Sequence, residues 1–592
     1  MAAFTSIASG NYNDGPTTWG TAAGTFPGST AAQADTITVA AGHTVTLNVT
    51  TLAGTVSTVT VAATGVFLVA ANFAATSKFT GGAWTIEGTL RWKNDAAGTY
   101  QLCVYQSSTI TVKNGGTFEM LSTADPAIIQ ILYLSQGSVS NSTNLYCEAG
   151  GTINIQGYAT KTQKTTSAAQ ISNGTTQITV ADDTGWATGD QIILSYGQSS
   201  LSRTITYVSP GVYNLNSAST INYPATISIY NMTKNVRLFN NNGARQTRMQ
   251  AAVGSIVTLK NVSLIHFQMN QMLCRGTYQR LTSYCNFGYT FYFNDNRVRA
   301  SELIGVVYGA TTTNLLSSGD NSILEDCDIL NIHATANVGM RLLQSCMVKN
   351  FYVSAGTGLS VSSSGRIYLQ NGCINSCSTV GITSANYEYY YAGNLRFGED
   401  EWGGTLQNAT DLSLGYAWGQ FDNCKFSASS VEVATPSLDG SMVILTNYDQ
   451  TEGFRKEFQR YGIVYSNSAE ARSGYCLACD PSSTTNPMKL LFSFPCASGM
   501  NPQIKFWAKK SGTMGDVGVL LPCNSAGIIE VTNNSGSVDA NGYITPTASW
   551  AQYTVNLTGN STIYGEVEVA IYMFDSSSGI LYIDDITISG NL

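Results

Sequence analysis

The sequence predicts an all-β protein, a right-handed parallel β-helix (a solenoid) followed by an antiparallel jelly-roll sandwich. A short phrase, Leu or Phe followed three or four residues later by Cys, returns between Gly276 and Ser427. Many short runs alternate apolar and polar residues and end at Gly or Asn, as strands and their turns do. Charged residues make up only 11% of the 592 residues, well below the roughly 25% of an average soluble protein. Thr, Ser, Asn and Gly must therefore build the surface, and they suit strands and turns.

Residues 1–165 are expected to form the N-terminal coils of the β-helix. Alternating runs with Gly or Asn corners lie at 35–47, 84–90, 110–118 and 151–155. Residues 166–240 continue with strand-like runs around a Gly- and Asp-rich turn, and it is a resemblance to a known β-helix family that implies a small β insert here.

These two regions also carry a resemblance. The matched positions are glycines, turns and core residues, namely Trp19, Pro27, 35–39, 42–47, 86–90 and 112–116. They resemble the opening coils of the G8-domain β-helix proteins, and a variant of this opening starts many phage virion proteins. The segment 178–194 is similar to the small β insert that follows the G8 coils. The resemblance covers about residues 15–270 and implies a fold. Some animal members degrade or bind hyaluronan, but no catalytic motif is matched here, so no catalytic residue is carried over.

Residues 241–435 are expected to be β-helix coils with a cysteine ladder. Self-similarity at roughly 20 to 50 residues indicates units that must stack to bury their apolar sides. An unoxidised Cys behaves as a small apolar residue, so we expect the repeated cysteines to stack inside the same corner of successive coils. They are Cys285, Cys327, Cys346, Cys373 and Cys424. The pair Cys476 and Cys479 is expected to lie on a strand, where residues three apart face opposite sides and cannot share a metal.

Residues 436–592 are expected to form the jelly roll, from strand-like runs that begin at 442–445 and end at 580–586. The closing segment 579–588 resembles the end of a carbohydrate-binding-module sandwich. That family often holds a structural calcium ion through an acidic residue at such a position, which makes Asp584 the candidate ligand and Asp439 a weaker second one. The alternative for Asp584 is an ordinary exposed turn acid. No other cofactor is expected.

The segment 386–402 is the candidate binding site, a loop-like insertion that places aromatic rings beside acids. Aromatic rings suit stacking on sugar rings, and they are also enriched at subunit interfaces. The expected binding residues are Tyr387, Tyr389, Tyr390, Tyr391 and Trp402. If the protein is an enzyme, its carboxylates would be Glu399, Asp400 and Glu401, since glycosidases need converging acids roughly 5 to 9.5 Å apart. Glu325 and Asp326, beside Cys327, are expected to be solvated residues of a coil corner.

Composition and the N-terminus narrow the functional classes. The net charge of −8 comes without a Lys/Arg cluster, which argues against nucleic acid. No apolar run reaches the roughly 18 residues of a membrane span, and the N-terminus has no signal-peptide pattern. We therefore expect a phage virion structural protein (tail spike, tail fibre or capsid fibre), made in the host cytoplasm and displayed on the virion surface. The alternative is a polysaccharide-degrading lyase or glycoside hydrolase. Expected partners are further copies in a homotrimer, other virion proteins and a host-surface glycan.

Overall fold

The computed structural model divides into two compact units, Met1–Arg341 and Leu342–Leu592. It describes residues 2–589 apart from the following gaps: 32–33, 75–77, 81, 106–107, 136–143, 198, 241–246, 275, 286–290, 294–298, 308–313, 319–321, 332–337, 343–345, 362–365, 385–387, 400–405, 407, 410–411, 415–416, 423, 425–430, 434–441, 447–454, 460–462, 468–469, 471, 473–475, 481–488, 497–502, 514–516, 521–527, 534–536, 539–542, 559–564 and 574–578. Within the described residues the helix is a π-helix, η1 (Gly15–Trp19). None of the described helical structure is long and apolar enough to span a bilayer.

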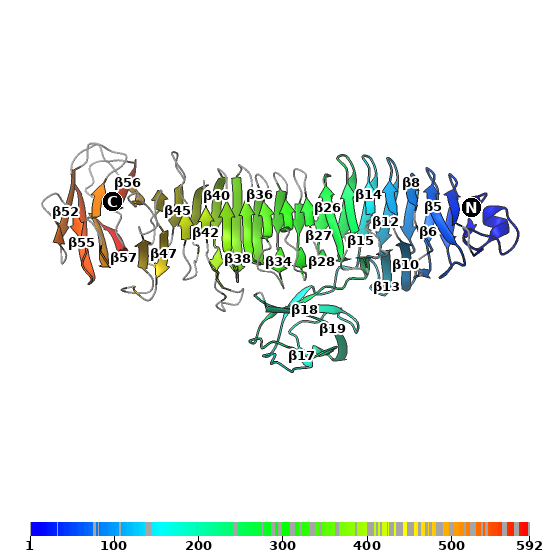
Figure 1. Cartoon of the computed structure of the whole chain (residues 1–592), viewed down its shortest axis with the longest axis horizontal. Helices are drawn as coiled ribbons and strands as arrows, with labels where there is room; N and C mark the ends of the chain where they lie inside the picture. The colour runs from blue at the N-terminus through cyan, green and yellow to red at the C-terminus, as the bar shows by residue number, and fades with distance from the viewer. Residues whose placement is uncertain are drawn as a thin grey trace. The chain divides into compact units, whose positions relative to one another are not determined.

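The first unit is a stack of coils whose strands add in parallel from one coil to the next (Figure 1). One of its sheets contains β1 (Ala3–Thr5), β3 (Ala34–Val39), β5 (Thr55–Val61), β8 (Ala83–Ile86), β11 (Thr109–Val112), β14 (Asn144–Cys147), β23 (Thr247–Ala251), β26 (Phe267–Met272), β29 (Phe291–Phe293) and β32 (Asn314–Ser318). The other contains β2 (Gly10–Asn11), β4 (Thr44–Leu47), β6 (Val66–Val69), β7 (Asn72–Phe73), β9 (Thr89–Trp92), β10 (Gly98–Tyr105), β12 (Thr117–Leu121), β13 (Ile128–Ser135), β15 (Thr152–Gln156), β22 (Val236–Phe239), β24 (Ile256–Lys260), β25 (Val262–Ile265), β27 (Gly276–Gln279), β28 (Thr282–Cys285), β30 (Arg299–Ser301), β31 (Ile304–Val307), β33 (Ser322–Glu325) and β34 (Asp328–Asn331). Strand β35 (Val338–Leu342) lies at the division between the units.

The core of the first unit is built from vertical rows of apolar side chains. Along β3, β5, β8, β11, β14 and β23 the Cα register aligns one inward position of every coil. The residues in this row are all buried: Val39, Val61, Ile86, Val112, Cys147 and Ala251. Complete burial of an aliphatic side chain contributes about 1.5–3 kcal/mol, so the alternating pattern of the sequence is what holds the stack together.

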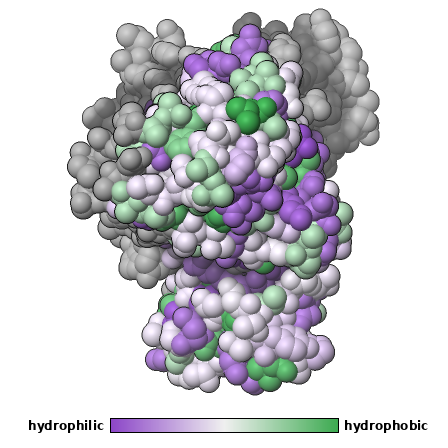
Figure 2. All heavy atoms as spheres, turned by 90° about the vertical axis from the view of Figure 1, so that its right-hand side faces the viewer, coloured by the Kyte–Doolittle hydropathy of each residue, from purple (hydrophilic) through white to green (hydrophobic). Residues whose placement is uncertain are grey.

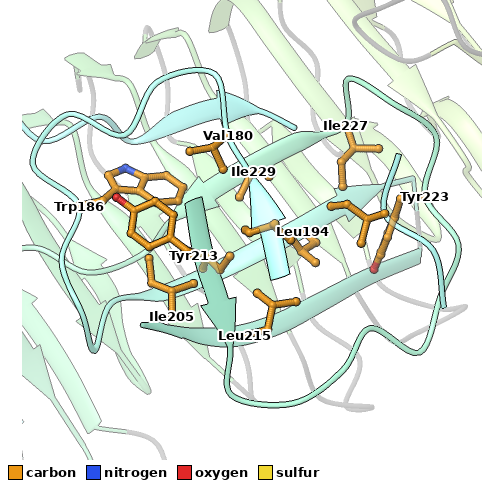
Figure 3. Packing of buried hydrophobic residues seen from close by; sticks show 12 residues of the cluster. Val180, Trp186, Leu194, Ile205, Tyr213, Leu215, Tyr223, Ile227 and Ile229 are labelled. Carbon is orange, nitrogen blue, oxygen red and sulfur yellow. The ribbon is translucent and has the colours of Figure 1, made fainter. Parts of the chain in front are cut away.

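A six-stranded antiparallel set is inserted between β15 and β22. Its strands are β16 (Lys164–Thr166), β17 (Gln177–Thr179), β18 (Gln191–Tyr196), β19 (Ser199–Ser209), β20 (Val212–Leu215) and β21 (Ser228–Asn231). Figure 3 shows its own apolar core, in which the ring centroids of Trp186 and Tyr213 lie 5.6 Å apart and to which Leu194 also belongs. The insertion leaves the solenoid in register, because β22 pairs directly with β13 of the preceding coil.

The coils turn at residues in the left-handed backbone region. Asn261, Arg280, Glu302 and Asp326 have φ between 52° and 54°, and each separates two strands of the second sheet. The N–H groups of Asn261, Arg280 and Glu302 reach the next coil, as from Arg280 to the carbonyl of Ser301 at 3.0 Å. These turns, and not the cysteines, mark the repeat of the solenoid.

The expected cysteine ladder is therefore wrong in its register. Cys327, Cys346, Cys373 and Cys424 are buried, as expected, whereas the side chain of Cys285 lies outside the described set. The Cα partners of these cysteines are not cysteines: Cys285 pairs with Val307, Cys346 with Ile367, and Cys373 with Tyr352 and Arg396. The spacing of the phrase varied because the cysteines occupy different positions of the coil.

The second unit begins with parallel coils and ends with antiparallel sheets. Its parallel strands are β36 (Cys346–Ser354), β37 (Thr357–Val361), β38 (Arg366–Asn375), β39 (Val380–Ser384), β40 (Glu388–Gly393), β41 (Arg396–Phe397), β42 (Leu412–Leu414), β43 (Ala417–Asp422), β44 (Val431–Val433) and β45 (Met442–Thr446). The antiparallel strands are β46 (Arg455–Gln459), β47 (Ile463–Asn467), β48 (Cys476–Asp480), β49 (Lys489–Cys496), β50 (Gln503–Ser511), β51 (Val517–Leu520), β52 (Ile528–Asn533), β53 (Ser537–Val538), β54 (Ile544–Thr545), β55 (Ala551–Thr558), β56 (Gly565–Met573) and β57 (Ile580–Ser589).

Strand β45 joins the two parts, because it pairs parallel with β43 and antiparallel with β46. Cys476 and Cys479 lie on strand β48, as expected. The predicted fold class, a parallel β-solenoid followed by antiparallel β-structure, is confirmed. On the molecular face seen in Figure 2, hydrophobic residues are scattered among polar ones.

Candidate functional site

The aromatic and acidic segment 386–402 is only partly a loop. Residues 388–393 form strand β40, which pairs in parallel with β38 and β43, so the expected loop-like insertion is wrong for this stretch. Strand β40 carries Tyr389, Tyr390 and Tyr391, whose side chains lie outside the described set. Tyr387, Asp400, Glu401 and Trp402 lie outside the described residues altogether.

Glu399 is the one proposed catalytic acid that the structure describes. It is half-buried, and its backbone carbonyl accepts a hydrogen bond of 2.7 Å from the Asn375 side chain. Asn375 is itself buried on β38. This contact fixes the chain where it leaves the coil. The distances from Glu399 to Asp400 and Glu401, which a glycosidase mechanism would require, lie outside the described residues.

A second cluster lies on one face of the sheet formed by β57, β50 and β55. On β50 the residues Ile504, Phe506 and Ala508 are buried in the apolar core. Successive side chains of a strand point to opposite faces, so Trp507 and Lys509 share the other face. The register places Trp507 beside Asp584 and Lys509 beside Tyr582, both on β57. We call this surface, with Trp550, the aromatic face.

Two cations lie over the rings of the aromatic face. The Arg472 guanidinium stands 4.0 Å from the centroid of the Trp507 ring. The Lys509 ammonium lies 5.0 Å from the Trp550 centroid and 5.2 Å from that of Tyr582. Such cation–π contacts contribute about 0.5–2 kcal/mol, more when desolvated.

Acidic residues orient the same cations. Lys509 also pairs with Glu470 at 2.6 Å, and Arg472 pairs with Asp585. Contacts with both rings and carboxylates therefore set the positions of the two cations.

Asp584 anchors the chain that crosses this face. It is 3% exposed within strand β57, so the alternative of an exposed turn acid is wrong. One carboxylate oxygen accepts the backbone N–H of Arg472 at 2.8 Å, and the other accepts the N–H of Asp585 at 2.8 Å. Asp585 has φ +48°, and the β50–β57 register shifts beside it. This is the local shape of a β-bulge, a feature that re-aims side chains near sites.

The expected calcium ligands are not brought together by the described residues. Calcium takes six to eight oxygen ligands, and no group of three or more His, Cys, Asp or Glu side chains forms a metal cluster in the described part of the chain. Asp439, the second expected ligand, lies outside it. The calcium site stays a prediction, while the structure gives Asp584 a hydrogen-bonding role that needs no ion.

Sequence reasoning missed the aromatic face, although the signal was present. The strand-like run around 503–508 was recognised, yet the alternation that buries Phe506 also places Trp507 and Lys509 together on the opposite face. The contact between Arg472 and the Trp507 ring joins two segments that are distant in sequence, so no local sequence pattern predicts it.

No protein-family model and no curated protein matches the chain. Among solved structures it is similar to the tailspike gp61 of Pseudomonas phage phi297, at 9% identity and a TM-score of 0.22, over 84% of this chain and 90% of that one. It is similar to the gp54 tailspike of Acinetobacter baumannii bacteriophage AP22, in complex with a capsular saccharide, at 9% identity and a TM-score of 0.16, over 82% and 91%. A family 16 carbohydrate-binding module is 16% identical with a TM-score of 0.16, over 21% and 84%. We therefore base the function on this chain's own residues.

Proposed function

We propose that this protein is a structural component of a phage particle, displayed on the virion surface as a tail spike, tail fibre or capsid fibre, and that it attaches to a host-surface glycan. A stacked β-helix with few charged residues provides a repetitive support. The observation that carries the glycan-binding part is the aromatic face, where Trp507, Lys509 and Tyr582 lie on one side of a sheet.

The aromatic face combines the two kinds of group that sugars need. Ring surfaces and edges pack against the C–H groups of a pyranose, and orienting polar side chains bind its hydroxyls, as in other small-molecule sites. Trp507 and Trp550 supply rings that are neither buried nor fully exposed. Arg472 and Lys509 supply donors, and Glu470 supplies an acceptor.

Binding of the full chain to an array of bacterial capsular and O-antigen polysaccharides tests this proposal. We expect the wild type to retain at least one polysaccharide and Trp507→Ala to weaken its retention at least tenfold. Tyr368→Ala is the matched control, because Tyr368 is an exposed ring on the solenoid strand β38. Equal retention by Trp507→Ala and the wild type would rule out the aromatic face as the binding surface.

The same incubation separates attachment from degradation. We expect no release of reducing ends from the retained polysaccharide. Release that is abolished by Glu399→Gln or Glu401→Gln would establish the alternative, a polysaccharide-degrading enzyme that uses the segment 399–401.

A further inference from the structure

The first unit contains a pocket of about 590 Å³ where the inserted sheet meets the coils. Three stretches supply much of its wall. They are Pro126, Ala127 and Ile129 before and in β13, Tyr158 and Lys161 ahead of the insert, and the turn that ends at Asp190. Lys234, Asn235 and Arg237 close it where the chain returns to the coils. We call it the seam pocket. Its volume lies within the range typical of small-molecule sites, about 300–1,000 Å³.

The seam pocket holds more positive than negative charge. Three cations line it, Lys161, Lys234 and Arg237, against the single carboxylate of Asp190. Lys161 pairs with Asp190 at 2.6 Å, and the same carboxylate oxygen accepts the amide of Asn231 at 2.9 Å. Asp190 is therefore neutralised by Lys161, which leaves the charges of the other two cations uncompensated within the lining.

Lys234 is buried without a counter-ion. Its side chain is only 2% exposed and it lines the seam pocket. Among the described residues its ammonium has no hydrogen-bond or ion-pair partner, and only its backbone N–H is engaged, by Ser263 at 2.8 Å. Burial, followed by the positive charges of Arg280 and Lys161, lowers the pKa of Lys234 well below 10.5. A charge in this position destabilises the folded chain unless something binds it.

Arg237 lies next to Lys234 and is oriented toward the same cavity. Its Nε donates to the carbonyl of Lys234 at 2.7 Å, and none of the described residues accepts a hydrogen bond from the two terminal nitrogens of the guanidinium. A guanidinium held in this way presents a planar pair of donors that fits a carboxylate or phosphate group.

The insert does not need Lys234 to stay attached to the coils. Lys164 of β16 pairs with Asp328 of β34 at 2.8 Å, and the Arg280 guanidinium donates to the carbonyl of Lys161 at 3.1 Å. The side-chain amide of Gln163 contacts the Glu302 carbonyl at 3.4 Å. These contacts attach the insert to the coils without the Lys234 ammonium.

We propose that the seam pocket binds an anionic carbohydrate, whose carboxylate or phosphate group is held by Lys234 and Arg237. The pocket is several times larger than an inorganic anion, so the ligand carries further atoms. Tyr158, Thr160 and Thr188 also line it, and they offer hydroxyl groups to a sugar. This site lies in the first unit and is independent of the aromatic face.

Isothermal titration of the full chain tests the proposal with four probes: glucuronate, glucose 6-phosphate, inorganic phosphate and uncharged glucose. We expect glucuronate or glucose 6-phosphate to bind at least tenfold more tightly than glucose and than phosphate, and the better of the two identifies the anionic group. Lys234→Met should weaken that binding at least tenfold, as expected for loss of a charge-assisted hydrogen bond. Lys260→Met, the same change on β24 outside the pocket lining, should leave it unchanged.

A second measurement separates ligand binding from a structural role. Without ligand, Lys234→Met should melt at the same or a higher temperature than the wild type. Met is close to Lys in length, and it lacks the buried amine that has no partner among the described residues. The proposal is overturned if neither charged sugar binds more tightly than glucose or phosphate, or if Lys234→Met leaves their affinity unchanged. A lower melting temperature together with unchanged affinity would assign Lys234 to the fold alone.

Discussion

At the scale of single residues, Lys234 and Asp584 show opposite ways to bury a charge. Asp584 is surrounded by donors, since the backbone N–H groups of Arg472 and Asp585 satisfy its two oxygens. Lys234 has no such partner among the described residues. A buried charge with its hydrogen bonds made is a structural anchor, whereas one without them indicates a place for a ligand.

The affinity of the seam pocket should depend on pH through Lys234. Burial, then Arg280 and Lys161, lower its pKa, whereas Glu302 and Asp190 act in the opposite direction. A bound anion favours the charged ammonium, so the complex has a higher Lys234 pKa than the free protein. Between these two values the complex holds more protons, and affinity must fall as the pH rises through this window.

We therefore expect glucuronate or glucose 6-phosphate to bind less tightly as the pH is raised through this window, with proton uptake that titrations in buffers of different ionisation enthalpy will reveal. Lys234→Met should show neither effect. If the proton uptake persists in Lys234→Met, another group of the pocket carries the titration.

Calcium at Asp584 is a prediction that a chelator can test. Anything bound by the folded state alone stabilises it by mass action. We expect the full chain to melt at a lower temperature in excess chelator, and Asp584→Asn to abolish that difference. Because the carboxylate also anchors Arg472, Asp584→Asn should lower the melting temperature even in chelator. A wild type that melts identically with and without chelator shows that Asp584 acts as a hydrogen-bonding anchor only.

At the scale of elements, the sequence predicts strands well and their stacking poorly. Alternation of apolar and polar residues depends only on a strand's two faces, so runs such as 35–39 and 110–112 could be located directly. Stacking depends on which residues align between coils, and the conspicuous cysteines suggested the wrong alignment. The left-handed turns carry the true register, but Arg280, Glu302 and Asn371 share no side-chain type that would reveal it.

In the second unit this turn is reinforced by a row of amides. Asn350, Asn371 and Asn394 all have φ between 50° and 56°. The amide of Asn371 donates to the oxygen of Asn350 at 3.0 Å, and that of Asn394 donates to Asn371 at 3.0 Å. Asn tolerates the left-handed region better than most residues, and it also links one coil to the next.

Asn371→Val should test this turn. A β-branched residue at φ +54° stores backbone strain of about 1–3 kcal/mol, and the substitution removes both amide contacts. We expect a clear loss of melting temperature. Gln370→Val, at the exposed neighbouring position with ordinary strand geometry, should be neutral or slightly stabilising because Val favours strands. Equal melting temperatures for the two variants would mean that the turn conformation is not needed.

At the scale of the whole molecule, the fold class followed from composition and periodicity, while the sites did not. The predicted segment 386–402 stood out because its rings and acids are adjacent in sequence. The seam pocket unites Lys161, Asp190 and Lys234, which become neighbours only when the insert docks on the coils. Such a site cannot be recognised without the tertiary structure. The domain boundaries at 165, 240 and 435 stay predictions.

We expect the protein to be a homotrimer. The uncharged polar surface of the coils gives little electrostatic repulsion between copies, since charged residues are only 11% of the chain. Light scattering during gel filtration at micromolar concentration should give three times the 63.0 kDa of one chain. Because few charges are available to pair across the contact, the trimer should persist when salt is raised to about 1 M, where the screening length is roughly 3 Å. A mass of one chain at micromolar concentration would contradict the prediction, and dissociation by salt alone would show that ion pairs hold the copies together.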